Sequence, residues 1–445
     1  MTQAPTAPKA APRRHDREIL ALAVPAFGAL VAEPLFVLAD SAIVGHLGTS
    51  QLAGLGIAAA LLTTAVSVFV FLAYATTSAV ARRVGAGDLQ GAIRQGMDGV
   101  WLALLLGVAV IAVVLPTAPS LISLFGASDT VAPYAVTYLR ISALGIPAML
   151  MVLAATGVLR GLQDTRTPLY VAVGGFALNG VLNVALVYGA GLGIAGSAWG
   201  TVLAQCAMAA AYLVVVVRGA RRHGASLRPD AAGIRACAQA GAPLLVRTLS
   251  LRAILLIATA VAARLGDAEI AAHQVLLSLW SLLAFALDAI AIAGQAIIGR
   301  YLGADDTEGA RAVCRRMVQW GIGSGIVLGL LVVVARPVLI PLFTSDPAVE
   351  RAILPALLVV ALSQPIGGVV FVLDGVLMGA GDGPYLARAM LLTLAVFTPA
   401  ALLVPVLGGG VTALWGAMTL MMLVRMATLQ LRARSGRWLV AGATR

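Results

Sequence analysis

Twelve long apolar runs divide this sequence, and their number and length constrain its fold more than any other feature. Each run is between 21 and 30 residues long, and about 20 apolar residues are enough for a helix to cross a hydrocarbon layer of roughly 30 Å. We therefore expect an all-α integral membrane protein with twelve transmembrane helices. The runs are 19–44, 52–81, 96–116, 132–159, 168–190 and 194–217, followed by 242–263, 270–298, 317–340, 352–378, 385–407 and 410–431.

The composition and the positions of the charges agree with this expectation. Charged residues make up only 11% of the chain, against about a quarter in soluble proteins. Of the 30 Lys and Arg residues, 24 lie in or near the two tails and the even-numbered loops, and 3 lie in or near the odd-numbered loops. Since basic residues collect in short cytoplasmic loops, both termini should be cytoplasmic. The net charge of +11 is therefore explained by the basic residues of the cytoplasmic loops, and we expect no nucleic-acid partner. We expect the protein to be a monomer in a bacterial cytoplasmic membrane.

The two halves of the sequence repeat each other with a constant offset of 218 residues. An even number of spans per repeat predicts parallel halves, related by an axis along the membrane normal, with a substrate path between them. The predicted parts are a tail (1–18), a six-helix lobe (19–217), a linker (218–241), a second lobe (242–431) and a tail (432–445). The matching residues include Pro25 with Pro243, Arg82 with Arg300, Gly85 with Gly303, Phe125 with Phe343, Pro147 with Pro365, and 157–164 with 375–382.

Four acidic residues, Glu33, Asp40, Asp288 and Asp374, lie well inside the apolar runs. An ionisable residue there costs roughly 2.5–3.5 kcal/mol on insertion scales, so it needs a functional or structural reason. Glu33 and Asp40 are seven residues apart and share one face of the first helix, where Pro34 favours a kink. A carboxyl group in apolar surroundings holds a proton more readily than one in water and can release it when water or a cation arrives. Asp40 is the preferred functional candidate.

The alternative for these acids is a structural ion pair inside the membrane. Arg140, Arg247 and Arg252 lie within the apolar runs and could supply the positive charge. For Glu33 and Asp288 neither the functional nor the structural interpretation is preferred.

Polar residues on the fifth and sixth runs are candidate partners of these acids. Asn179 and Asn183 lie one turn apart, so their amide oxygens could accept a hydrogen bond from a protonated Asp or help to ligate a cation. Hydrogen bonding between helices is the commoner role of such residues. Thr201 lies on the sixth run, and in the second half Gln295 shares a face with Asp288. We expect Asp288, Gln295 and Asp374 to line a cavity in the second lobe.

The sequence contains no motif that is typical of an enzyme active site. The four histidines are scattered, without an HExxH pattern or a nucleophile signature, and the three cysteines have no metal-ligand spacing. No Walker A sequence is present either, so ATP is not the expected energy source. We expect no enzymatic activity, no metal site and no cofactor, which leaves an ion gradient as the driving force.

Several segments together resemble the multidrug and toxic compound extrusion (MATE) family, in its DinF-like branch. They are VLADSAIVGHLG (37–48), RRVGAGD (82–88) with its partner GRYLGADD (299–306), NGVLNVALVYGAGLGIAGSAWGT (179–201) and FVLDGVLMGAGD (371–382). The resemblance spans residues 17–431 and implies two six-helix lobes around a cleft. It also implies export of cationic or amphipathic small molecules in exchange for protons or sodium ions.

The resemblance also suggests roles for individual residues. Asp40 matches the coupling aspartate of the first helix, while Asn179 and Thr201 match polar partners in the first lobe. Asn183 departs from the pattern, because many relatives have Asp there, and this loss of a carboxylate favours protons over sodium. The alternative function is a lipid-linked precursor flippase of related architecture, for which a strongly basic cleft would be expected.

Overall fold

The computed structural model describes residues 12–444, apart from the side chains of residues 12–14, 33, 36, 38 and 39. The regular structure of this range is helical. The helices of the first half are α1 (Pro12–Gly45), α2 (Thr49–Val68), α3 (Phe71–Gly85), α4 (Leu89–Leu124), α5 (Ala132–Ala143), α6 (Ile146–Gly161), α7 (Arg166–Val184), the π-helical turn η1 (Ala185–Gly189) and α8 (Gly193–Arg222). Those of the second half are α9 (Ala231–Leu265), α10 (Asp267–Gly303), α11 (Thr307–Phe343), α12 (Pro347–Gly379), α13 (Gly383–Val406) and α14 (Val411–Ser435).

The helices confirm the predicted membrane architecture. Among the described residues, ten helical segments are long and apolar enough to cross a membrane, and the bent pair α5 and α6 makes an eleventh. Helix α1 has 34 residues, which is long enough for the remaining span. The protein is an all-α integral membrane protein with two repeated halves.

Two predicted spans are broken in a way that the apolar runs did not indicate. The run 52–81 becomes α2 and α3, which meet at Phe69 and Val70. The run 132–159 becomes α5 and α6, which meet at an angle of 48°. Pro147 occupies the first turn of α6, where the missing N–H of a proline removes no hydrogen bond of the helix. In the middle of one continuous helix the same proline would remove a hydrogen bond and interrupt the helix.

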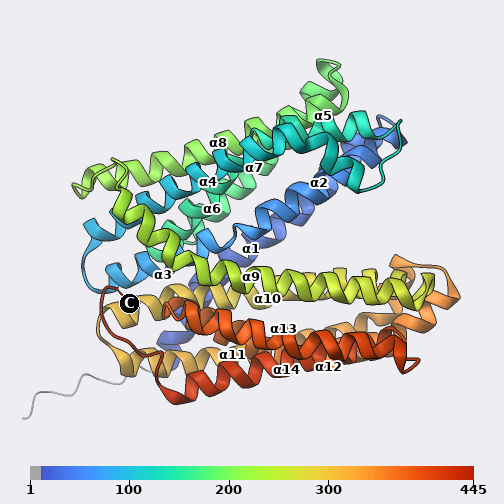
Figure 1. Ribbon diagram of the computed structural model, residues 1–445. Helices are drawn as coiled ribbons and strands as arrows, with labels where there is room; N and C mark the ends of the chain where they lie inside the picture. Colours follow the sequence, from blue (N-terminus) through green and yellow to red (C-terminus); the bar gives the residue numbers. More distant parts are fainter. Residues whose placement is uncertain (1–11, 445) are drawn as a thin grey trace, which may run out of the picture.

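The two halves meet at one end of the bundle and separate toward the other. In Figure 1, α4–α8 form one group and α9–α14 a second, and the groups approach each other at the end that carries the carboxyl terminus. Helix α1 crosses between them, packing on α10 and α11 as well as on α7. Helix α3 joins the groups, since it contacts α4 and α6 in the first half and α9 and α10 in the second.

Two glycines permit the close approach of the halves, and they are related by the repeat. A Cβ atom on Gly85 would collide with the carbonyl group of Arg300, and a Cβ atom on Gly303 would collide with the carbonyl group of Arg82. The two glycines are 218 residues apart in the sequence, and so are the two arginines. The reciprocal contact of α3 and α10 therefore lies on the pseudo-twofold axis, and Gly is required there because any side chain would push the halves apart.

The repeated loop motifs act as helix caps. Asp88 Oδ1 accepts a hydrogen bond of 2.8 Å from the Gly91 amide at the start of α4. Asp306 Oδ1 accepts one of 2.7 Å from the Gly309 amide at the start of α11. An aspartate at this position satisfies an amide that the helix leaves without a partner, which stabilises the helix by about 1 kcal/mol. The same loop chemistry thus starts equivalent helices in both halves.

Candidate functional site

Asp40 is the centre of a buried polar cluster in the first half. The carboxylate is 7% exposed and accepts three hydrogen bonds. Asn183 Nδ2 and Ser197 Oγ donate to Oδ1 at 2.6 and 2.8 Å, and the Tyr138 hydroxyl donates to Oδ2 at 3.3 Å. Helices α1, α5, α7 and α8 each contribute one of these residues. Such donors satisfy the charge of a carboxylate that the apolar surroundings would otherwise make costly.

The packing of α7 against α8 depends on small residues. A Cβ atom on Gly196 would lie 2.7 Å from the carbonyl oxygen of Leu186, and one on Gly200 would collide with the side-chain oxygen of Asn183. The π-helical turn η1 follows α7 directly; such turns are frequent at functional sites. Glycines on α8 therefore let the helix approach close enough for Ser197 to reach Asp40.

Asn179 and Thr201, both predicted as partners of Asp40, form a neighbouring pair. Asn179 Nδ2 donates to Thr201 Oγ1 at 3.1 Å, and Thr201 in turn donates to the carbonyl oxygen of Ser197. The side-chain oxygens of Asn179 and Asn183 are buried and have no hydrogen-bond donor among the described residues. A buried acceptor without a partner is rare, so these two amide oxygens can accept a hydrogen bond from a protonated group or from a ligand.

A cavity of about 320 Å³ lies beside this cluster, between α1 and α7. Asp40 and Asn179 supply its polar lining, and the rest is apolar: Ala32, Leu35, Ile43, Val173, Phe176 and Gly180. Apolar walls with a few polar groups are typical of small-molecule sites. Glu33, the other predicted acid of α1, has a side chain outside the described residues.

The second half contains a different charged cluster, in which Asp374 is shared by two arginines. Arg247 donates to both carboxylate oxygens, and Arg425 donates to Oδ2 at 2.6 Å. All three side chains are buried. Both oxygens of Asp374 are therefore occupied by guanidinium groups, and its place in a cavity of the second lobe stays a prediction.

Asp288 and Gln295 share α10 but differ in their surroundings. Asp288 is partly exposed and interacts electrostatically with Arg160 and Arg247. Gln295 is 1% exposed, and its amide donates to the carbonyl oxygen of Tyr74 at 2.5 Å. Gln295 thus ties α10 to α3 across the two halves, and its place in a cavity stays a prediction.

The arginines inside the helices are also more numerous than the sequence indicated. Arg140 donates to the carbonyl oxygen of Leu115 and forms no ion pair with an acid whose side chain the structure describes. Arg160 and Arg425, which were counted with the loops and the tail, are buried at 9% and 4% exposure. They were missed because each lies near the end of an apolar run, where sequence alone does not show how far a long side chain reaches inward.

Ser197 and Tyr138 are the functional candidates that sequence reasoning missed. Ser197 lies one turn before Thr201 on α8 and therefore on the same face, a spacing that could have identified it. Tyr138 carried no such signal, because α5 approaches Asp40 only through the tertiary fold.

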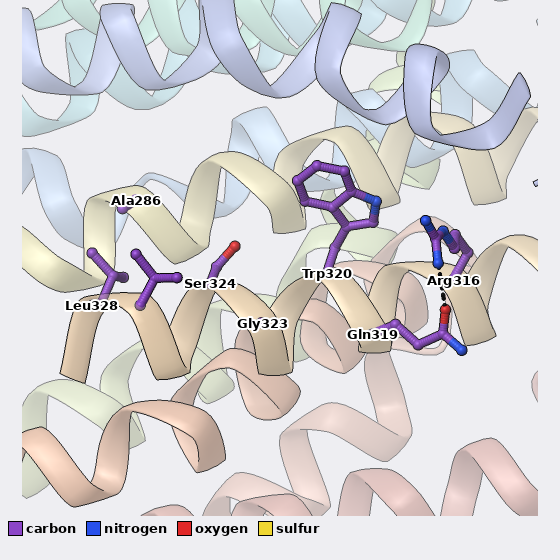
Figure 2. Close-up of a pocket in the computed structure, with 8 residues that line it drawn as sticks. Ala286, Arg316, Gln319, Trp320, Gly323, Ser324 and Leu328 are labelled. Atoms are coloured by element: carbon purple, nitrogen blue, oxygen red, sulfur yellow. Dashed lines mark hydrogen bonds between the residues drawn. The ribbon is translucent and has the colours of Figure 1, made fainter. Parts of the chain in front are cut away.

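A second cavity, of about 510 Å³, lies along α11 near α10. Figure 2 shows Trp320 and Ser324 projecting from one side of α11 and Arg316 hydrogen-bonded to Gln319. Arg316 and Trp320 both donate to Asp16 of α1. The charge in this cavity is thus already neutralised by α1, and the cavity contains no carboxylate comparable to Asp40 among its lining residues.

Comparison with known proteins agrees with this architecture. The MatE family model matches residues 25–185 and 243–404, and the two matches begin 218 residues apart. The chain is 31% identical over 443 residues to DNA damage-inducible protein F of Escherichia coli, covering 96% of this chain and 94% of that protein. It is also 31% identical over 440 residues to Protein DETOXIFICATION 44, chloroplastic, of Arabidopsis thaliana, covering 95% and 83%.

Solved structures show the same fold. The bent form of a Vibrio cholerae MATE transporter superposes with a TM-score of 0.87 at 22% identity, covering 97% of this chain and all of that one. The family match spans both halves, and its repeat offset equals the one found in the sequence. This chain therefore belongs to the MATE family of membrane transporters.

Proposed function

We propose that this protein exports cationic or amphipathic small molecules in exchange for protons. The observation that carries the proposal is Asp40, a buried carboxylate that both lines the cavity between α1 and α7 and accepts three hydrogen bonds. One group can then bind either a proton or a cationic substrate. Because the two ligands compete, each weakens the binding of the other, which is the linkage that an antiporter requires.

The donors around Asp40 favour protons over sodium as the coupling ion. A sodium site needs several oxygen ligands around the cation, preferably including a charged one. Here Asn183 presents its N–H to the carboxylate, and an amide N–H cannot ligate a cation. The hydroxyls of Ser197 and Tyr138 can rotate to accept a hydrogen bond, so they can accommodate a protonated Asp40 as well as an ionised one.

The contacts between the halves support an assignment of sides and of conformational state. Gly85, Gly303 and Gln295 join the halves at the end where the chain terminates, and the basic loops lie at the same end. We assign this end to the cytoplasm of a bacterial cell, with both termini inside. The structure then represents an outward-open state, in which a proton can reach Asp40 from outside and displace the substrate.

Alternating access follows from the same geometry. Return to the inward-open state must break the contact of α3 with α10 and bring the opposite ends of the halves together. Helix α1 packs on both halves, so its path must change during this movement. The linker 218–241 joins the halves at the closed end and can remain in place. We propose that one chain carries out the complete cycle as a monomer.

The experiment that tests this proposal is ethidium export from proteoliposomes containing the purified protein. We expect a pH gradient without sodium to drive export, and a sodium gradient at fixed pH to have no effect. Asp40→Asn should abolish the proton-driven export. Export driven by sodium alone would contradict the choice of ion, and unchanged export by the variant would contradict the role of Asp40.

A further inference from the structure

The chain after α14 folds back onto the end of the bundle where the halves meet. Gly436 ends α14 in the left-handed conformation, with a φ of 66°, and a glycine in this conformation is a common way to end a helix. Trp438 follows and is 1% exposed, and its indole N–H donates to the carbonyl oxygen of Ala433 at 3.0 Å. Residues 436–444, the carboxyl-terminal segment, then end near α3 in Figure 1.

The carboxyl-terminal segment follows the last helix of the second half, but an arginine of the first half holds it. Arg82 of α3 donates to the carbonyl oxygens of Val440 and Gly442, both at 2.9 Å. The same guanidinium group donates to the carbonyl oxygen of Ala380, just after α12, at 2.8 Å. The amide of Gly442 donates to the carbonyl oxygen of Leu302 of α10 at 3.0 Å. The segment is therefore bound to both halves at once.

Arg300, which the repeat makes equivalent to Arg82, holds a segment from the other end of the chain. Its guanidinium group pairs with Glu18, near the start of α1. Asp16, also near the start of α1, accepts two hydrogen bonds from Arg316 of α11, at 2.7 and 2.8 Å. Helix α1 of the first half is thus bound to the second half, and the carboxyl-terminal segment of the second half is bound to the first. The two segments are exchanged across the contact of α3 with α10.

The two exchanged segments differ in how independently they can move. Helix α1 is continuous from Pro12 to Gly45 and includes Asp40, so its first turns move with the rest of the helix. The carboxyl-terminal segment contains no regular helix in its described part, and its hydrogen bonds to Arg82 and Leu302 are made by its backbone. It can therefore detach while the helices around it keep their structure.

We propose that the carboxyl-terminal segment is a strap that holds this end of the bundle closed and that must detach before the halves separate there. Arg82 holds the strap from the first half, and Leu302 holds it from the second. Moving α3 away from α10 breaks one of these two sets of hydrogen bonds. The inference rests on the proposed alternation of access, and it identifies a part of the chain that sets the balance between the two states.

The test measures the distance between the halves at their opposite, separated end, with pulsed electron paramagnetic resonance of two spin labels. The labels are attached to Asp129→Cys and Ser345→Cys, with the native cysteines replaced. Both positions are exposed and lie in the α4–α5 and α11–α12 loops, which Figure 1 shows at the separated end. The full-length protein is compared, in nanodiscs at one fixed pH, with a shortened protein that ends at Ser435.

Removing the strap should increase the population of the inward-open state. Because the halves rock against each other as units, opening one end brings the other ends together. We expect the share of short distances between the two labels to rise at least threefold in the shortened protein. Loss of order confined to the closed end would leave the distance at the separated end unchanged, so the measurement reports the strap and not local unfolding.

Trp438→Ala and Arg437→Gln are a matched pair of variants within the strap. Trp438 is buried and anchors the strap, whereas the neighbouring Arg437 is exposed. Trp438→Ala should increase the share of short distances as the shortening does, and Arg437→Gln should give the distances of the full-length protein. This pair tests the strap even if the shortened protein fails to fold, because each variant changes a single side chain.

Two results would overturn the inference: distances in Trp438→Ala that equal those of the unsubstituted strap, or an equal shift in Trp438→Ala and Arg437→Gln. The measurement uses neither ethidium nor a pH gradient. Failure of the strap is thus separable from failure of proton coupling, which is read from ethidium export.

Discussion

Replacing Asp40 with Asn removes the charge of the first-half cluster while keeping its shape. The side-chain oxygen of Asn can still accept from Asn183 and Ser197, and the Tyr138 hydroxyl can rotate to accept from the new amide. Hydrogen bonds to a charged group contribute about 1.5–3 kcal/mol and neutral ones about 0.5–1.5 kcal/mol. The lost strength is offset by the smaller cost of burying a neutral group, so we expect the variant to fold.

The effect on function should be much larger than the effect on stability. A cationic substrate that pairs with Asp40 loses about 1.5–3 kcal/mol in the variant, which corresponds to roughly a 10- to 150-fold weaker Kd at about 1.4 kcal/mol per factor of ten. Proton-driven export should fall to the level of empty vesicles, because Asn does not titrate. The assay is ethidium efflux from proteoliposomes under an imposed pH gradient, together with ethidium binding in detergent.

Asp129→Asn is the matched control, since Asp129 is an exposed residue of the same half. It should export ethidium as the wild type does. Undiminished export by Asp40→Asn, with normal folding, would refute the assignment of Asp40. Export lost equally in both variants would show that the loss is not specific to this carboxylate.

Three further changes test the surroundings of Asp40 and the architecture. Ser197→Ala removes one hydrogen-bond donor to the Asp40 carboxylate, so the pH profile of export should shift from that of the wild type; an unchanged pH profile would contradict this role. Arg82→Gln removes donors to the backbone of the carboxyl-terminal segment, including Val440 and Gly442, and should lower the thermal unfolding midpoint in detergent by several degrees, whereas an equal midpoint would show that the contact contributes no stability. With the native cysteines replaced, Ala190→Cys should react with a membrane-impermeant thiol reagent from outside and Ala304→Cys only from inside, and reversed labelling would refute the assignment of sides.

The helices of this protein could be predicted from sequence because membrane spans are governed by a length and a composition. Ends such as Gly303 and Gly379 coincide with loop motifs that repeat in both halves. The breaks could not be predicted equally well. Pro147 gives a local reason for the bend before α6, whereas the end of α2 at Val68 has no proline or glycine beside it.

The candidate site was only partly predictable, for a geometric reason. Asp40 and Asn183 are conspicuous because polar residues are costly inside apolar runs, and the structure brings them into direct contact. Which residue of a neighbouring helix completes the cluster depends on how that helix is rotated about its axis. Ser197 was therefore missed although Thr201, one turn away, was identified, and Arg425 was missed because its charge suggested the cytoplasmic tail.

The central claim is that a proton and a cationic substrate compete for Asp40. The most direct measurement is proton release when ethidium is added to the purified protein in weakly buffered detergent, followed with a pH indicator between roughly pH 5 and 8. The account predicts that release approaches about one proton per ethidium bound where Asp40 is protonated beforehand, and that Asp40→Asn releases none. Ethidium binding without proton release at every pH, or equal release by the variant, would contradict it.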